Sequence, residues 1–208
     1  MQVSNRPYRR LGQFSAVLAA AVTALVAIGG PAQADDDFVY SPPDGGGHNY
    51  CYGSSLPSVF QTHISESMYT LIGSTEVPSA ARGTCNTTAA SGQTDVQWEG
   101  TGDLGSTTFG RAQCAKWYNS KCDRYVVNLN KGAMDTYATN DANQYRKTAC
   151  HELGHTAGGS HYAAFNGPVE STSAVSPDCL VSGIQDSGNT ASKTYNSHHR
   201  TSHFNKFF

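Results

Sequence analysis

Apolar residues recur at steps of three and four between residues 56 and 72, which is the period of a helix with one apolar face. Pro57 suits the first turn of such a helix, and Gly73 suits its end. The pattern therefore predicts an amphipathic helix over 56–72. Its apolar stripe would consist of Leu56, Val59, Phe60, Ile64, Met68, Leu71 and Ile72.

The period then changes from helix to strand. Thr94, Val96 and Trp98 alternate with polar residues, which predicts a half-buried strand with Trp98 as a core anchor. This strand could also lie at a sheet edge and pair with an extended peptide. Residues 106–113 form a weaker strand candidate, and the β-branched run at 125–129 predicts a buried strand.

A second helix is expected to begin near Asn140 or Asp141, because Asp141 and Gln144 have the spacing of a capping box. Beyond His161 the chain is rich in Gly, Ser and Thr, and only a short last helix over 194–206 is indicated. The order helix, strands, helix and irregular tail predicts one α+β domain. The apolar face of the second helix would carry Ala142, Tyr145, Ala149 and Leu153.

Residues 1–34 have the features of a secretory signal peptide: three arginines, an apolar run and small residues before a cleavage point after Ala34. The apolar run is about 15 residues long, whereas a membrane-spanning helix needs roughly 20. We therefore expect a secreted, extracellular protein without a membrane anchor in its mature form. Residues 35–50 are expected to be a flexible arm rich in Pro and Gly, and 51–208 the folded domain.

Charge and cysteine content narrow the function classes further. Cleavage after Ala34 leaves 11 basic side chains against 16 acidic ones, a net charge of −5, which argues against nucleic acid or an anionic membrane as partner. We expect a monomer. Six cysteines, none of them spaced C-x-x-C, predict three disulfides rather than a thiolate metal site. Cys114 and Cys122 could close a hairpin-like loop, although spacing alone leaves their pairing open.

The chemistry-bearing stretch runs from Cys150 to His161 and reads H-E-x-x-H-x-x-G-x-x-H from its second residue. His151 and His155 are four residues apart, so on a helix their imidazoles project from one face and can share a cation. Glu152 is rotated about 100° from His151. It can flank the metal without binding it, which is the place for a base that takes a proton from metal-bound water.

A third ligand requires the chain to turn back after the helix. Gly158 suits a residue with positive φ that ends the helix, and His161 would then return as the third imidazole. Three neutral histidines leave one position open, as in a catalytic zinc site. A chance match to this pattern is expected in roughly one chain in 10⁴ to 10⁵.

The motif resembles the extended zinc motif of the metzincins, the clan that includes astacins, matrixins and small secreted bacterial proteases similar to snapalysin. The resemblance implies a single α+β domain with a mixed sheet, an N-terminal helix, an active-site helix and an irregular C-terminal subdomain. It also implies that His151, His155 and His161 bind Zn²⁺, that Glu152 is the catalytic base, and that proteins or peptides are the substrates.

One feature departs from the metzincin pattern. Members of this clan carry a methionine in a tight turn beneath the zinc, but every methionine here precedes the motif. Leu180 is the best local substitute, because leucine is close to methionine in volume. Cys150 and Cys179 directly precede His151 and Leu180, so we predict a disulfide that pins the helix to this turn. Cys114–Cys122 and Cys51–Cys85 would complete the set.

Other candidate residues carry weaker signals. His198, His199 and His203 could form a second metal cluster, although a solvated His-rich terminus is the simpler interpretation. Tyr195 could stabilise the reaction oxyanion, as tyrosines do in some metzincins.

The sequence leaves more than one function open. The motif predicts a secreted zinc endopeptidase in which Glu152 activates a zinc-bound water. A non-catalytic secreted zinc-binding module is the main alternative, but it would gain nothing from an acid at Glu152. A metal-dependent hydrolase of substrates other than peptides is the second alternative.

Overall fold

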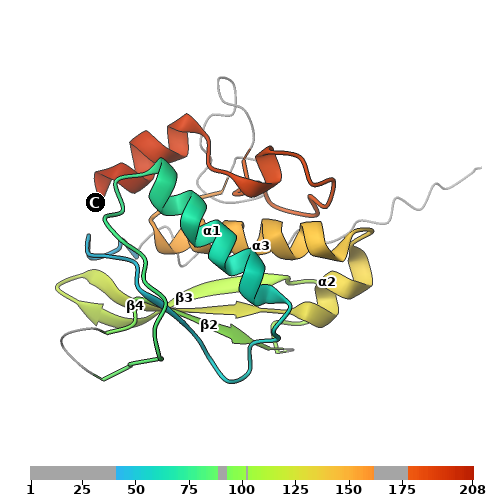
Figure 1. Cartoon of the computed structure of the whole chain (residues 1–208), viewed down its shortest axis with the longest axis horizontal. Coiled ribbons are helices and arrows are strands. Elements are labelled where there is room, and N and C mark those ends of the chain that lie inside the picture. Colours follow the sequence, from blue (N-terminus) through green and yellow to red (C-terminus); the bar gives the residue numbers. More distant parts are fainter. Residues whose placement is uncertain (1–40, 89–92, 102, 162–177) are drawn as a thin grey trace, which may run out of the picture.

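The computed structural model describes residues 41–88, 93–101, 103–161 and 178–208. These form one α+β domain in which helices pack on one face of a four-stranded sheet (Figure 1), so the predicted fold class is confirmed. The predicted signal peptide, 1–34, lies outside the described residues. None of the helices in the described part has the length and apolar character needed to cross a membrane.

The sheet is mixed, with strand order β1-β2-β4-β3. Its strands are β1 (Tyr50–Tyr52), β2 (Val96–Gly100), β3 (Gly110–Tyr118) and β4 (Lys121–Leu129). β1 pairs in parallel with β2 and β2 in parallel with β4, whereas β3 and β4 form an antiparallel hairpin. Among the described strands, β1 and β3 are therefore the two edges.

β2 confirms the predicted alternation. Val96 and Trp98 are fully buried, while Gln97 and Glu99 face the other side of the sheet and are only partly buried. Trp98 is thus a core anchor, as predicted. The idea that this strand could receive an extended peptide at a sheet edge is wrong, because β2 lies between β1 and β4.

The β3–β4 hairpin is longer than expected. The weak strand predicted at 106–113 begins at Gly110 and continues to Tyr118, past the cysteine that was expected to open a loop. Asn119 and Ser120 both have positive φ (48° and 63°), which allows a two-residue turn that keeps the strands paired. Ser is not typical at such a position, which explains why the sequence did not signal the turn.

The helix predicted over 56–72 is α1 (Phe60–Ser74). Its apolar stripe is mostly confirmed, but the chain before Phe60 forms turns closed by hydrogen bonds from Leu56 N to Gly53 O and from Phe60 N to Pro57 O. Leu56 is still buried, whereas Val59 is 42% exposed. The apolar pattern therefore extends one turn beyond the helix itself.

The predicted second helix is α3 (Asp141–Thr156). Its cap is Asn140, whose side chain accepts a hydrogen bond from Asn143 N, so the capping box assigned to Asp141 and Gln144 is wrong by one residue. A short helix that the sequence did not signal, α2 (Lys131–Tyr137), precedes it and is capped by Asn130 in the same way.

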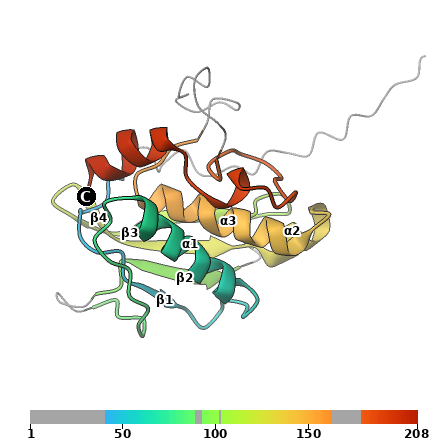
Figure 2. The same cartoon turned by 45° about the horizontal axis from the view of Figure 1, so that its top comes forward.

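α3 is the central element of the domain. It contacts α1 and the sheet strand β3, and the segment that ends the chain lies over it on the side away from the sheet (Figure 2). Tyr145, Ala149 and Leu153 face the core as predicted, but Ala142 is exposed. The last helix expected over 194–206 is present in part, because residues 197–206 are continuously helical and include η4 (His199–His203) and η5 (Phe204–Lys206), while the separate turn η3 (Ala191–Lys193) precedes them.

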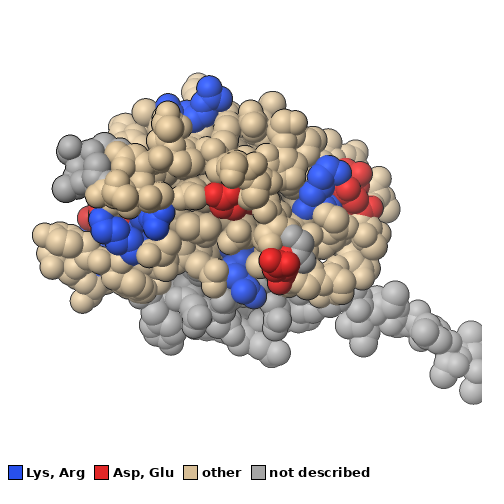
Figure 3. All heavy atoms as spheres, turned by 90° about the horizontal axis from the view of Figure 1, so that it is seen from below, with Lys and Arg blue, Asp and Glu red and all other residues tan. Residues whose placement is uncertain are grey.

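All three proposed disulfides are confirmed: Cys51–Cys85, Cys114–Cys122 and Cys150–Cys179. The predicted flexible arm is described from Ser41 onward, and this part is not loose. Tyr125 donates its hydroxyl proton to Ser41 O, and Cys122 N donates to Pro42 O. Seen from below the sheet (Figure 3), positive and negative side chains are scattered among uncharged ones.

Asp95 provides a pH test of this fold. Burial raises the pKa of Asp95 to about 7, although its Oδ2 accepts a hydrogen bond from Asn49 N. A folded pKa above the unfolded value of about 3.9 means that Asp95 favours folding at low pH and that this contribution is lost as the pH rises through 7. We expect Asp95→Asn to raise the urea midpoint relative to the parent more at pH 8 than at pH 4.5.

The exposed Asp103 provides the control, because Asp103→Asn removes the same charge from the surface. Equal shifts for Asp95→Asn at the two pH values would contradict the prediction.

Candidate metal centre

The last turn of α3 and the chain that follows it place the motif residues. His151, Glu152 and His155 all lie on α3. Gly158 has φ +92°, so the predicted left-handed turn is present, and Gly159 N donates to Gly154 O to close it. A β-carbon on Gly158 would lie 2.3 Å from the ring of Phe207, which adds a second reason for glycine there.

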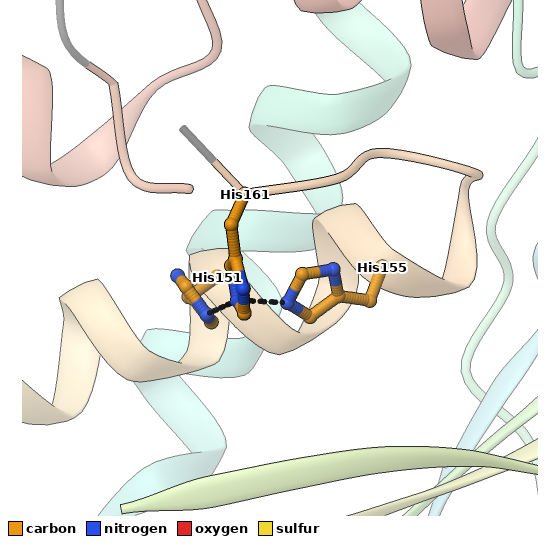
Figure 4. Close-up of side chains that lie close together, drawn as sticks. All are labelled: His151, His155 and His161. Carbon is orange, nitrogen blue, oxygen red and sulfur yellow. Dashed lines mark hydrogen bonds between the residues drawn. The ribbon is translucent and has the colours of Figure 1, made fainter. Parts of the chain in front are cut away.

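The turn brings the three imidazoles together. His161 Nε2 lies 2.9 Å from His151 Nε2 and 3.0 Å from His155 Nε2 (Figure 4). Within the described ranges this is the only group of three or more potential ligands that could hold a metal ion. The three histidines that the motif singled out therefore meet at one point.

The hydrogen bonds of the Nδ1 atoms decide which tautomer His151 and His155 adopt. His151 Nδ1 lies 2.8 Å from Cys179 O, and His155 Nδ1 lies 2.9 Å from Gly159 O. A carbonyl oxygen can only accept, so each Nδ1 carries the proton and each Nε2 presents a lone pair. His161 Nε2 has at most one proton to offer to these two acceptors, so hydrogen bonding alone does not satisfy the group.

A cation between the three Nε2 atoms would satisfy them better than a single proton does. Nitrogen ligands bound at 2.0–2.1 Å to a tetrahedral ion lie about 3.3 Å apart, close to the distances observed here. Burial lowers the pKa of His155 to about 4 and that of His161 to about 2, and it also holds the pKa of His151 well below its usual value. All three imidazoles are neutral near pH 7, which is the form that binds metals.

Glu152 lies against the start of β3. It is 2% exposed, its carboxylate accepts a backbone hydrogen bond from Ala112, and a β-carbon on Gly110 would lie 2.6 Å from its Oε1. Its Oε2 is buried and has no hydrogen-bond partner among the described residues. Burial raises the pKa of Glu152 to about 8. A buried acid with one unsatisfied oxygen is suited to proton transfer.

The turn that begins at Asp178 forms the floor of the centre. The Cys150–Cys179 disulfide joins it to α3, and the side chain of Leu180 is fully buried. β-carbons on Gly154 or Gly159 would lie less than 3 Å from Leu180, so this leucine fills the space beside both glycines. Leu180 therefore provides the apolar floor that the sequence suggested.

Several residues of the centre were missed by sequence reasoning. Lys147 is fully buried one turn before His151, and its Nζ lies 3.2 Å from Gly183 O and 3.5 Å from His151 Nδ1. Because His151 Nδ1 already donates to Cys179 O, Lys147 acts on that ring as a charge. Its spacing of four residues from His151 was a signal that could have been used, whereas no sequence pattern marks the Cys179 and Gly159 carbonyls.

Two weaker candidates are not in the centre. Tyr195 is buried and donates its hydroxyl proton to Cys150 O, so it stabilises the helix and does not face a reaction site. The rings of His198, His199 and His203 lie near one another, but their nitrogens do not form a metal-binding group. His199 instead forms a buried pair with Asp178.

Comparison with known proteins adds no family. Neither a scan against protein-family models nor a search of curated proteins finds a match. The resemblance to the metzincins therefore stays a prediction that rests on the motif, while the metal-binding arrangement rests on the geometry.

Leu180 offers a test of the floor. We expect Leu180→Met to change the free energy of unfolding by less than about 1.5 kcal/mol and to leave metal binding intact, because volume is conserved. Leu180→Ala should cost about 2–5 kcal/mol, because it leaves a cavity beneath the helix. Urea unfolding measures both values. Equal losses for the two variants would show that Leu180 does not act through volume.

Proposed function

We propose that this protein is a secreted zinc-dependent endopeptidase. The observation that carries the proposal is the convergence of three imidazoles, two of which lie on the same helix, α3, as the buried Glu152. Three histidine ligands suit Zn²⁺ and leave a coordination position open for chemistry. Three disulfides and the predicted signal peptide support secretion.

The chain supplies rigid ligands and a base. A bound zinc ion would act as a Lewis acid that polarises the scissile carbonyl and makes water more acidic. Glu152 would take a proton from the attacking water and pass it to the amine as the C–N bond breaks. The Cys179 and Gly159 carbonyls keep His151 and His155 in the tautomer that presents Nε2.

The sheet supports a peptide as the substrate. β3 is an edge strand in the described sheet, and its first residues, Gly110 and Ala112, lie beside Glu152. An extended peptide can add to such an edge through backbone hydrogen bonds. A peptide paired with β3 would run past the carboxylate that is proposed to move the proton.

Glu152 is the first residue to test. We expect Glu152→Gln to keep the bound zinc and to lower kcat for casein hydrolysis by about 10²–10⁴-fold, because the amide cannot accept the proton. Parent and variant are compared at equal zinc content, measured by atomic absorption. Retained turnover in the variant would refute the role of Glu152. Inactivity of both proteins with zinc present would favour the non-catalytic zinc-binding module.

His161 tests the ligand set. We expect His161→Ala to weaken zinc binding by more than about 100-fold, because losing a ligand costs more than losing an outer-shell contact. His63→Ala is the matched control and should leave affinity unchanged, since His63 lies on α1 and outside the metal-binding group. Chelator competition measures both. Tight zinc binding by His161→Ala would remove His161 from the ligand set.

A further inference from the structure

A buried pair of polar residues lies at the turn that forms the floor of the metal centre. Asp178 and His199 have side chains that are 1% and 0% exposed, and Asp178 Oδ2 lies 2.7 Å from His199 Nδ1. Neither residue belongs to the ligand group or carries out a step of the proposed reaction. Burying such a pair is costly unless its hydrogen bonds are well made, so its contacts indicate what it holds in place.

Asp178 ties the floor of the centre to the last part of the chain. Its Oδ1 accepts from Leu180 N at 2.9 Å, and its Oδ2 accepts from Asn196 N at 2.8 Å as well as from His199. Cys179 O and Leu180 N belong to the same peptide group, so the bond from Leu180 N to Asp178 also orients that carbonyl, and Cys179 N donates to Thr194 O. The carbonyl that receives the His151 proton is therefore held by the hydrogen bonds of Asp178.

His199 is linked through Phe204 to Gly159, whose carbonyl orients His155. Its ring stacks on Phe204 with centroids 6.3 Å apart and an interplanar angle of 19°. Phe204 is fully buried and lies against Gly159, where an added β-carbon would be 2.7 Å from the Phe204 ring. Gly159 O receives the proton of His155 Nδ1. Asp178 thus supports the carbonyl that orients His151, and His199 supports the carbonyl that orients His155.

We propose that Asp178 and His199 are a pair of positioning residues for the metal centre, which fix the two backbone carbonyls that orient His151 and His155. The inference rests on the proposed zinc site but not on peptidase activity. Loss of outer-shell partners typically lowers metal affinity by about 10–100-fold, because the ligands lose their orientation.

The test measures metal binding rather than turnover. Asp178→Asn keeps the shape of the side chain but cannot accept all three hydrogen bonds, and His199→Phe keeps the ring but loses the donor. We expect each variant to weaken zinc binding by about 10–100-fold and to change the visible absorption spectrum of the Co²⁺-loaded protein. His199→Asn retains a donor close to the Nδ1 position but loses the ring that stacks on Phe204, so it should weaken zinc binding as well.

The two residues should also act as one unit. We expect Asp178→Asn combined with His199→Phe to weaken zinc binding no more than the worse single variant does, because both break the same contact. Tyr125→Phe is the control for stability. It removes a buried hydrogen bond to Ser41 O that involves neither the three histidines nor the two carbonyls that orient them, and it should leave zinc affinity and the Co²⁺ spectrum unchanged.

The outcomes separate this inference from the proposed function. Parent-like zinc affinity and Co²⁺ spectra in folded Asp178→Asn and His199→Phe would overturn the positioning role, even if both variants were less stable. A parent protein that binds neither zinc nor cobalt would overturn the metal centre itself.

Discussion

The hydrogen bonds from His151 and His155 to two backbone carbonyls are the constraint on which the rest of the centre depends. Each bond decides which ring nitrogen carries the proton, and therefore whether Nε2 can bind a cation. Both carbonyls belong to chain that follows α3, at Gly159 and Cys179. The helix alone can place the imidazoles on one face, but it needs the turn and the floor to make them ligands.

Polar side chains buried around α3 all need hydrogen-bond partners, because an unpaired polar group in the interior destabilises the fold. Lys147, Gln144 and Thr148 are buried on the helix together with the ligands, and each has a hydrogen-bond partner. Three neutral imidazoles converge with at most one proton between them, so a cation would pair with their lone pairs better than hydrogen bonds do. Metal binding at this site would therefore also stabilise the folded state.

Sequence reasoning located the cluster of three histidines and the main elements because their signals are local. The spacing of His151 and His155, the glycine at 158 and the alternation around Trp98 each follow from the geometry of one helix, one turn or one strand. The sequence did not reveal that β2 is an internal strand, because strand order depends on contacts between distant segments. The roles of Asp178 and His199 were hidden for the same reason, since residues 21 positions apart meet only in the folded chain.

The leucine in place of the expected methionine follows from what the floor has to do. Leu180 packs against Gly154 and Gly159 through its side chain, whereas the floor's contact with a ligand comes from the backbone of Cys179. The side chain therefore needs apolar volume, and the chemistry of a thioether has no partner in these contacts. A disulfide at Cys179 and hydrogen bonds from Leu180 N and Cys179 N fix the backbone instead. If the chain is the metzincin-like peptidase proposed above, its leucine stands at a position where side-chain shape matters and ligand chemistry does not.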